Sequence, residues 1–285
     1  MAGLAAGLAE ARRLKVERIR VPLAEPAALE GLQVLHVSDT HVKGPRDWPI
    51  DALSELRGLA PDILVATGDL ITGPGGLPPV ARALGGVKPR LAAYVVPGNH
   101  DHWHQGHLRS LSGAVGPFVC PAEFAAVMAE HGLTVLANAA ESLETGRGSI
   151  NVVGMDDPYL SMARPEIAYS GLGEERPTLV LAHSPDAAAL LQGRRCELLL
   201  CGHTHGGQIL PPGGLPPLTT NTRPRLPAPF GLMVLEGILT HVSAGVGTAN
   251  VPLRINCPPR ATLLHFVDAG VPPEATPTNG PRRRE

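Results

Sequence analysis

The amino-acid sequence predicts a layered α/β fold, and three observations support this. Short runs rich in Val, Ile and Leu recur along the 285 residues, as strands do. Helical patterns separate the early runs. Later runs lack helices between them, so we expect these strands to pair antiparallel. A chain of this length forms one large or two small domains.

The apolar runs predict ten strands. In chain order they cover residues 32–38, 62–67, 91–96, 134–138, 149–154, 178–182, 197–201, 231–235, 238–243 and 261–267. Helical periodicity predicts helices at residues 49–59, 77–84, 122–131 and 185–191, the last following the cap residue Ser184. We expect a single domain over residues 16–267, a flexible N-terminus over residues 1–15 and a disordered tail over residues 268–285, which has little apolar content.

The charge balance argues against nucleic acid as a partner. Lys and Arg number 24 against 26 Asp and Glu, which gives a net charge of -2. The apolar runs are too short for a membrane-spanning helix, and Arg12 and Arg13 follow the apolar start in the wrong order for a secretory signal. Four cysteines are too few for a disulfide scaffold. We therefore expect the cytoplasm, with peripheral attachment to a membrane as the alternative.

Polar residues suited to metal binding follow five of the predicted strands. They are Asp39 and His41, Asp69, Asn99, His183, and His203 and His205. In open α/β sheets, ligands bind beyond the carboxyl ends of the strands, so these side chains are expected to converge. Within the pairs spaced by two, both side chains project to the same side of an extended chain. The sequence thus predicts one shared site.

Oxygen and imidazole donors without thiolate favour borderline divalent ions. Seven donors are too many for a single ion that must keep an open position, so we expect two ions, with manganese favoured and iron, zinc or cobalt as alternatives. The distribution we favour places Asp39, His41 and His205 on one ion and Asn99, His183 and His203 on the other. Asp69 then bridges the pair, because one carboxylate can span the ~3.5–4 Å between two such ions.

These blocks, D-x-H, G-D, G-N-H-D, H and G-H-x-H in this order, resemble the calcineurin-like metallophosphoesterase family. The resemblance implies a four-layer αββα sandwich of two mixed sheets flanked by helices, with a two-metal site at its edge. Residues 202–209, 245–248 and 252–256 resemble more narrowly the YkuE-type branch. Members of that branch include phosphodiesterases and UDP-2,3-diacylglucosamine pyrophosphatases, often with an N-terminal membrane or export segment, which we do not expect here.

A two-ion site predicts a hydrolase in which a hydroxide on the metals attacks phosphorus. His100 lies beside Asn99, where its ring can stabilise the phosphoryl group or protonate the leaving oxygen, and Asp101 can orient that ring. The expected bond is a phosphodiester or a pyrophosphate. The alternatives are a membrane-surface pyrophosphatase of the UDP-diacylglucosamine type and a non-catalytic binding scaffold. The expected partner is a small-molecule or lipid-linked phosphoester substrate.

Other residues have open roles. Trp103 can pack against a substrate group or only cover its loop. Arg223 and Arg225 can grip a phosphate or remain solvated loop residues, and Arg254 is a weaker substrate-binding candidate of the same kind. His36 and His241 are expected to be core or surface histidines.

Overall fold

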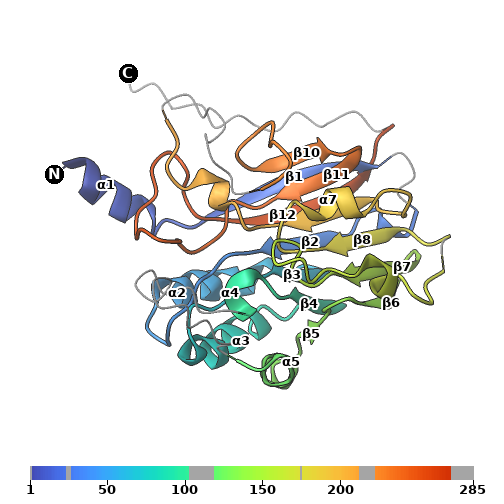
Figure 1. Ribbon diagram of the computed structural model, residues 1–285, viewed down its shortest axis with the longest axis horizontal. Coiled ribbons are helices and arrows are strands. Elements are labelled where there is room, and N and C mark those ends of the chain that lie inside the picture. The colour runs from blue at the N-terminus through green and yellow to red at the C-terminus, as the bar shows by residue number, and fades with distance from the viewer. Residues whose placement is uncertain (1, 24–26, 103–118, 174, 212–221, 271–285) are drawn as a thin grey trace.

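The computed structural model describes residues 2–23, 27–102, 119–173, 175–211 and 222–270. Two six-stranded mixed sheets pack face to face, and helices cover their outer faces (Figure 1). This architecture confirms the predicted four-layer αββα sandwich. Trp103 lies outside the described residues.

The first sheet has the strand order β1-β12-β2-β3-β4-β5. Its strands are β1 (Lys15–Leu23), β12 (Arg260–Asp268), β2 (Gln33–Val37), β3 (Ile63–Thr67), β4 (Ala92–Val96) and β5 (Thr134–Val135). The strands β2 to β5 are parallel, and β12 pairs antiparallel with β2. The carboxyl ends of β2, β3 and β4 therefore meet at one edge of this sheet.

The second sheet has the order β10-β11-β9-β8-β7-β6. Its strands are β10 (Gly231–Leu235), β11 (Ile238–Val242), β9 (Leu198–Cys201), β8 (Thr178–Leu181), β7 (Gly148–Gly154) and β6 (Ala139–Thr145). Antiparallel pairing holds for β10 with β11 and for β6 with β7. The prediction of antiparallel pairing is wrong for β7, β8, β9 and β11. These strands run parallel because the segments between them cross back over the sheet.

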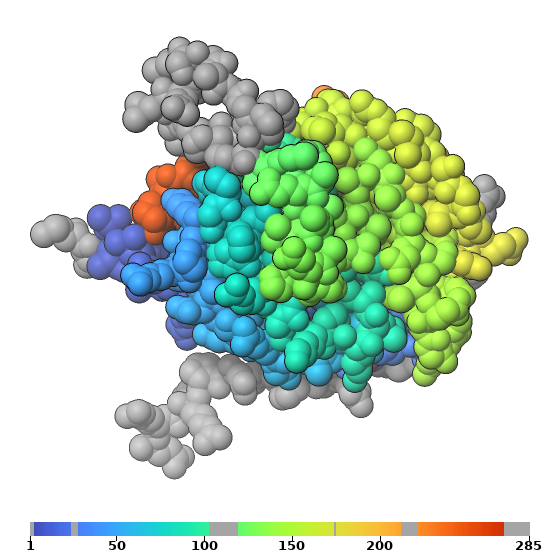
Figure 2. Space-filling view, turned by 90° about the horizontal axis from the view of Figure 1, so that it is seen from below, coloured from blue at the N-terminus to red at the C-terminus, as the bar shows by residue number. Residues whose placement is uncertain are grey.

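Alternation along the strands separates the layers. On β3, Ile63 and Val65 belong to the core between the sheets, whereas Leu64 and Ala66 pack against the helices. The helices of the first sheet are α2 (Trp48–Glu55), α3 (Leu77–Gly85) and α5 (Pro121–Glu130), and Figure 2 shows the face that they cover. The short helices α6 (Pro165–Ala168) and α7 (Ala187–Leu190) pack on the second sheet.

Three further segments lie near the edge where the site forms. Helix α4 (Asn99–His102) follows β4, and a 3-10 turn at His205–Gly207 follows β9. Helix α1 (Ala2–Glu10) packs beside the loop after β11, where the Gly7 carbonyl accepts a hydrogen bond from the backbone N–H of Arg254 at 3.0 Å.

Other 3-10 turns are Ala27–Leu29, Leu56–Leu59 and Pro74–Gly76. No helix of the described ranges is long and apolar enough to cross a membrane.

All ten predicted strands are present, but β1 and β6 were not predicted. Both are edge strands with charged, partly exposed side chains, which hide the apolar alternation of a strand. Helix α7 begins at Ala187, later than predicted, because Asp186 rather than Ser184 is its cap residue. The predicted domain limits stay a prediction.

Candidate metal centre

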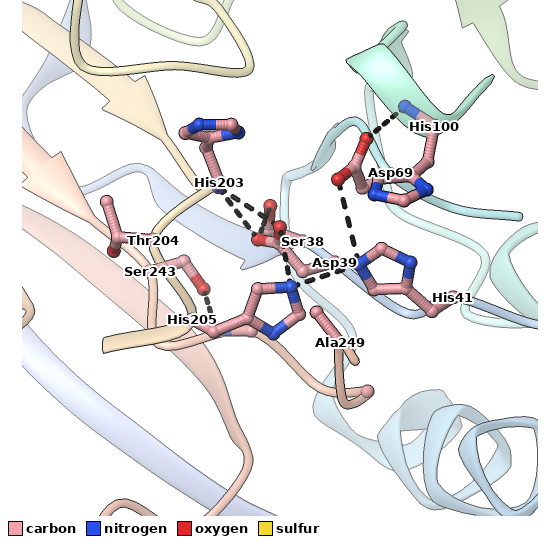
Figure 3. Close-up of polar contacts among 12 residues, drawn as sticks. Ser38, Asp39, His41, Asp69, His100, His203, Thr204, His205, Ser243 and Ala249 are labelled. Atoms are coloured by element: carbon pink, nitrogen blue, oxygen red, sulfur yellow. Dashed lines mark hydrogen bonds and ion pairs between the residues drawn. The ribbon is translucent and has the colours of Figure 1, made fainter. Parts of the chain in front are cut away.

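The loops that follow β2, β3, β4, β8 and β9 meet at one edge of the molecule and bring the seven predicted donors together. Asp39, His41 and His205 form one cluster (Figure 3). His205 Nε2 lies 3.0 Å from His41 Nε2 and 3.5 Å from Asp39 Oδ1, and all three residues are buried. Their ligand atoms lie within 4.8 Å of one another, which is close enough to share one ion.

The second cluster joins the two sheets. His203 Nδ1 lies 3.1 Å from Asn99 Oδ1 and 3.1 Å from His183 Nε2. Asp69, His183 and His203 also place their ligand atoms within 4.8 Å of one another. Asn99 comes from the first sheet, whereas the two histidines follow β8 and β9 of the second.

Asp69 lies between the two clusters. Its Oδ2 is 3.6 Å from His41 Nε2 and 3.3 Å from His183 Nε2. Its Oδ1 accepts a hydrogen bond from the backbone N–H of His100 at 2.8 Å. Burial alone would raise the pKa of this carboxyl, but neighbouring imidazoles, above all His183, hold it well below its usual value. A carboxylate in this position can serve both clusters.

The backbone of the site is strained. Asp39, His41, Asp69, His203 and His205 all have φ between 49° and 70°, in the left-handed region that side chains rarely adopt. Such residues persist only where the surroundings fix them, and they gather at functional sites. This backbone conformation turns the donor side chains toward the shared site directly after the strands end.

Two glycines permit the close approach of these loops. A Cβ on Gly202 would lie 1.8 Å from Ser38 Oγ and 2.3 Å from Asp39 Oδ2. A Cβ on Gly98 would lie 2.5 Å from the backbone nitrogen of Asp69. Only glycine leaves room for the carboxylates at these positions.

Hydrogen bonds behind the donors fix how the imidazoles face the site. His183 Nδ1 donates to the carbonyl of Thr67 at 2.8 Å, which turns Nε2 toward the site. His41 Nδ1 lies 3.1 Å from Thr72 Oγ1, so its Nε2 also faces inward. Ser38 Oγ donates its single proton to Asp39 Oδ2 at 2.5 Å and lies 3.2 Å from the Thr67 carbonyl.

The donor set fits divalent metal ions. His203 Nδ1 lies 3.1 Å from both Asn99 Oδ1 and His183 Nε2, so an amide oxygen and two imidazole nitrogens meet at short range. A cation bound there could take all three as ligands. Carboxylate, amide oxygen and imidazole are donors that borderline divalent ions accept.

His100 and Asp101 have different surroundings. The half-buried ring of His100 lies edge-on to His41, with 4.8 Å between ring centroids, and His100 lines the cavity of the site. Asp101 accepts hydrogen bonds from the backbone N–H groups of Leu70, Ile71 and Gly98 at 2.9–3.1 Å. These three bonds hold the Asp101 carboxylate against the loops after β3 and β4, and its predicted orienting role toward the His100 ring stays a prediction.

The cavity at the site has a volume of about 330 Å³. Its lining includes Asp69, Asn99 and His100 on one side and Gln208, Ile209 and Val251 on the other. Tyr159 also lines it, and its ring lies 4.8 Å from the His203 ring, centroid to centroid. Tyr159, Gln208 and Ser38 were not predicted to belong to the site. The signals that could have found two of them were the place of Ser38 directly before Asp39 and the place of Gln208 in the block 202–209.

The predicted substrate arginines lie elsewhere. Arg223 and Arg225 are exposed, neither lines this cavity, and the backbone N–H of Arg223 donates to Asp186 Oδ1 at 2.7 Å. Arg254 is fully buried. Its guanidinium donates to the carbonyls of Ala244, Gly245, Gly247, His205 and Cys257 at 2.7–3.2 Å. Contact of Arg254 with substrate is therefore wrong, because its donors hold the loop behind His205.

The fold and the donor cluster define a layered α/β protein with a candidate metal centre at the edge of its two sheets. Residues 32–207 match the family described as Calcineurin-like phosphoesterase, and the chain belongs to this family.

Three relatives extend this result. The chain is 30% identical over 259 residues to the uncharacterized metallophosphoesterase YkuE of Bacillus subtilis, covering 84% of this chain and 80% of YkuE. It is 28% identical over 244 residues to the phosphodiesterase YaeI of Escherichia coli, covering 82% of each chain. A transmembrane protein with metallophosphoesterase domain from Danio rerio is 32% identical over 259 residues, covering 85% of this chain but 54% of that protein.

Proposed function

We propose that this protein is a phosphohydrolase that uses two divalent ions to cleave phosphodiester or pyrophosphate bonds. The observation that carries the proposal is the position of Asp69, whose Oδ2 lies within 3.6 Å of an imidazole from each cluster. The relative YaeI, which is named a phosphodiesterase, supports the reaction class. All seven donors are present, which argues against a scaffold that has lost its metals.

Asp39, His41 and His205 would hold one ion and Asn99, His183 and His203 the other, with Asp69 between them. We propose manganese as the native metal, with iron, zinc or cobalt as alternatives. When bound, two such ions neutralise phosphoryl oxygens and lower the pKa of a coordinated water.

The chain itself contributes positioning and a proton. His100 lines the cavity, and its ring can donate a hydrogen bond to a phosphoryl oxygen or a proton to the leaving oxygen. The backbone N–H of His100 donates a hydrogen bond to Asp69 Oδ1. This bond keeps His100, the proposed proton donor, next to the carboxylate that both clusters share. Thr67 and Thr72 keep His183 and His41 turned toward the site.

Replacing Asp69 tests the proposal. In Asp69→Asn, manganese-dependent hydrolysis of bis(4-nitrophenyl) phosphate is expected to fall at least a hundredfold, and the metal content measured by mass spectrometry to fall below two ions per chain. Asp51→Asn on the exposed face of α2 is the matched control and keeps both. Full turnover in Asp69→Asn would overturn the proposal.

A second substitution separates catalysis from ligation. His100→Asn is expected to lower turnover at least tenfold while the metal content stays at the wild-type level, because His100 acts on the substrate. Loss of metal in this variant would make His100 a ligand, as its place beside His41 and Asp69 also permits.

A further inference from the structure

Three exposed apolar side chains surround the mouth of the metal cavity. Tyr159, Ile209 and Val251 line the same cavity as Asp69, Asn99 and His100, and they are 37%, 48% and 42% exposed. We call these three residues the apolar mouth. We infer that the apolar mouth is a binding subsite for an alkyl or aryl ester group of the substrate, an inference that rests on the proposed function and narrows it to diesters.

The apolar mouth is built before any substrate binds. The buried Gln208 amide donates from Nε2 to the carbonyls of Ala249 and Val251, at 3.1 and 2.9 Å, and its Oε1 accepts from the N–H of Ala249 at 2.9 Å. These bonds fix the loop that carries Val251 against the segment that carries Ile209. Preformed apolar surface beside a few polar groups is typical of a small-molecule site.

Apolar surface continues beyond the mouth. Ile209 and Ile255 form a β-bridge, and Ile255 is 36% exposed. Helix α1 packs beside this segment and exposes Leu8 at 40%. An extended alkyl chain that leaves the cavity past Ile209 could therefore contact the exposed side chain of Ile255.

The charges of the cavity favour a diester. None of the described residues that line it is a lysine or an arginine. Recognition of additional phosphate charges generally uses such side chains, and Arg223, Arg225 and Arg254 do not line the cavity. A phosphodiester carries one negative charge, which the proposed metal ions can neutralise, and two ester groups. A nucleoside diphosphate carries further negative charge, for which the described lining residues offer no lysine or arginine beside the proposed metal ions.

The test compares two substrates with the same leaving group and charge, methyl 4-nitrophenyl phosphate and hexyl 4-nitrophenyl phosphate, hydrolysed by the manganese-loaded protein. Burial of the hexyl chain is expected to lower KM on the order of tenfold relative to the methyl ester. The double variant Ile209→Ser/Val251→Ser is expected to lose this preference. Val234→Ser is the matched control, since Val234 is exposed on β10 and does not line the cavity.

A binding measurement gives a readout independent of turnover. Titration calorimetry with dihexyl phosphate is expected to show tighter binding than dimethyl phosphate and a negative heat-capacity change, both reduced in the double variant. Equal KM values for the two esters in the wild type would overturn the subsite while leaving the hydrolase proposal intact, whereas hydrolysis of neither ester would remove the hydrolase proposal itself.

Two other outcomes would also overturn the subsite. One is a higher kcat/KM for a nucleoside diphosphate ester than for the hexyl diester. The other is a double variant that keeps the preference for the hexyl ester but no longer sediments with phosphatidylglycerol vesicles as the wild type does. That result would make the apolar mouth a membrane contact instead.

Discussion

Ser38 connects the carboxylate of Asp39, a proposed metal ligand, to the neighbouring strand. Its hydroxyl lies within hydrogen-bond distance of both Asp39 Oδ2 and the Thr67 carbonyl, and that carbonyl also accepts from His183 Nδ1. Partners behind metal ligands typically change affinity or activity by about 10- to 100-fold when removed. Ser38 therefore orients donors of both clusters without itself facing the cavity.

We expect Ser38→Ala to weaken manganese binding about tenfold, because Asp39 loses the hydrogen bond that fixes its rotamer. Titration of the metal-free protein with manganese, followed by calorimetry, measures the change. Ser142→Ala on the edge strand β6 serves as the control. Unchanged manganese affinity in Ser38→Ala would show that strand geometry alone positions Asp39.

Arg254 stabilises the loop behind His205. Arg254→Met is expected to lower the free energy of unfolding by about 3 kcal/mol or more, because it leaves several buried carbonyls without donors. Urea denaturation of the metal-free protein measures this loss. Arg225→Met, at an exposed position, is expected to change the value by no more than about 0.5 kcal/mol. Equal stabilities of the two variants would refute the role.

The sequence allowed the donors to be predicted but not the roles of two charged neighbours. Asp39 and His183 directly follow apolar runs, so their place at strand ends could be read from the pattern. Asp101 and Arg254 are bound by backbone groups of other loops, including Leu70 and Gly247. Which loop amides and carbonyls face a given side chain depends on tertiary packing, and no local pattern records it.

At the scale of elements, a buried histidine pair joins one sheet to the other. His36 on β2 and His241 on β11 approach within 2.8 Å through their Nδ1 atoms, and His36 Nε2 lies 2.8 Å from Thr67 Oγ1. Burial lowers the pKa of His241 to about 3 and lowers that of His36 well below its usual value, with the neighbouring ring adding to the effect on His36. The folded protein thus keeps both rings neutral.

This pair predicts a loss of stability in acid. Below pH ~6.5 the unfolded chain binds protons that the folded rings exclude, so stability falls as pH decreases from about 6.5 toward 3, by about 1.4 kcal/mol per pH unit for each ring. His241→Gln removes one titrating ring and is expected to reduce this slope between pH 6 and 4 in the metal-free protein. Urea denaturation at several pH values measures it.

The exposed His265→Gln is the control for this slope. An identical pH dependence in His241→Gln and in the wild type would mean that other groups cause the acid sensitivity. From the sequence, both histidines were expected to be core or surface residues. Their hydrogen bond across the sheets could not be foreseen, because it depends on how the sheets stack.

At the scale of the whole molecule, the site depends on both sheets. Asp39, Asp69 and Asn99 follow strands of the first sheet, whereas His183 and His203 follow strands of the second. Metal ions that bind between them favour the docked sheets over the unfolded chain. Ligand binding to the folded state adds about 4 kcal/mol at a thousandfold excess over Kd.

We therefore expect manganese to raise the midpoint of thermal unfolding by several degrees and a chelator to reverse the change. Differential scanning calorimetry measures both. In Asp69→Asn, manganese should raise the unfolding midpoint much less, because the amide that replaces the shared carboxylate is a weaker metal ligand. A wild-type midpoint that does not respond to manganese would contradict a site that spans the sheets.

The layered class could be predicted because apolar runs and helical patterns alternate along the chain. The direction of the later strands could not. The crossing segments between β7, β8 and β9 contain only short helices such as α6 and α7, which leave little periodicity to read. The charged edge strand β1 was hidden for a related reason, since its exposed face lacks an apolar signal.

The backbone N–H of His203 donates to Asp39 across 164 residues of sequence. A ribosome therefore releases Asp39, His41, Asp69 and Asn99 long before the histidines that complete both clusters. The two donor clusters therefore cannot form in the nascent chain until the strands β8 and β9 of the second sheet have emerged, so we expect the proposed cations to bind only after His205 has left the ribosome.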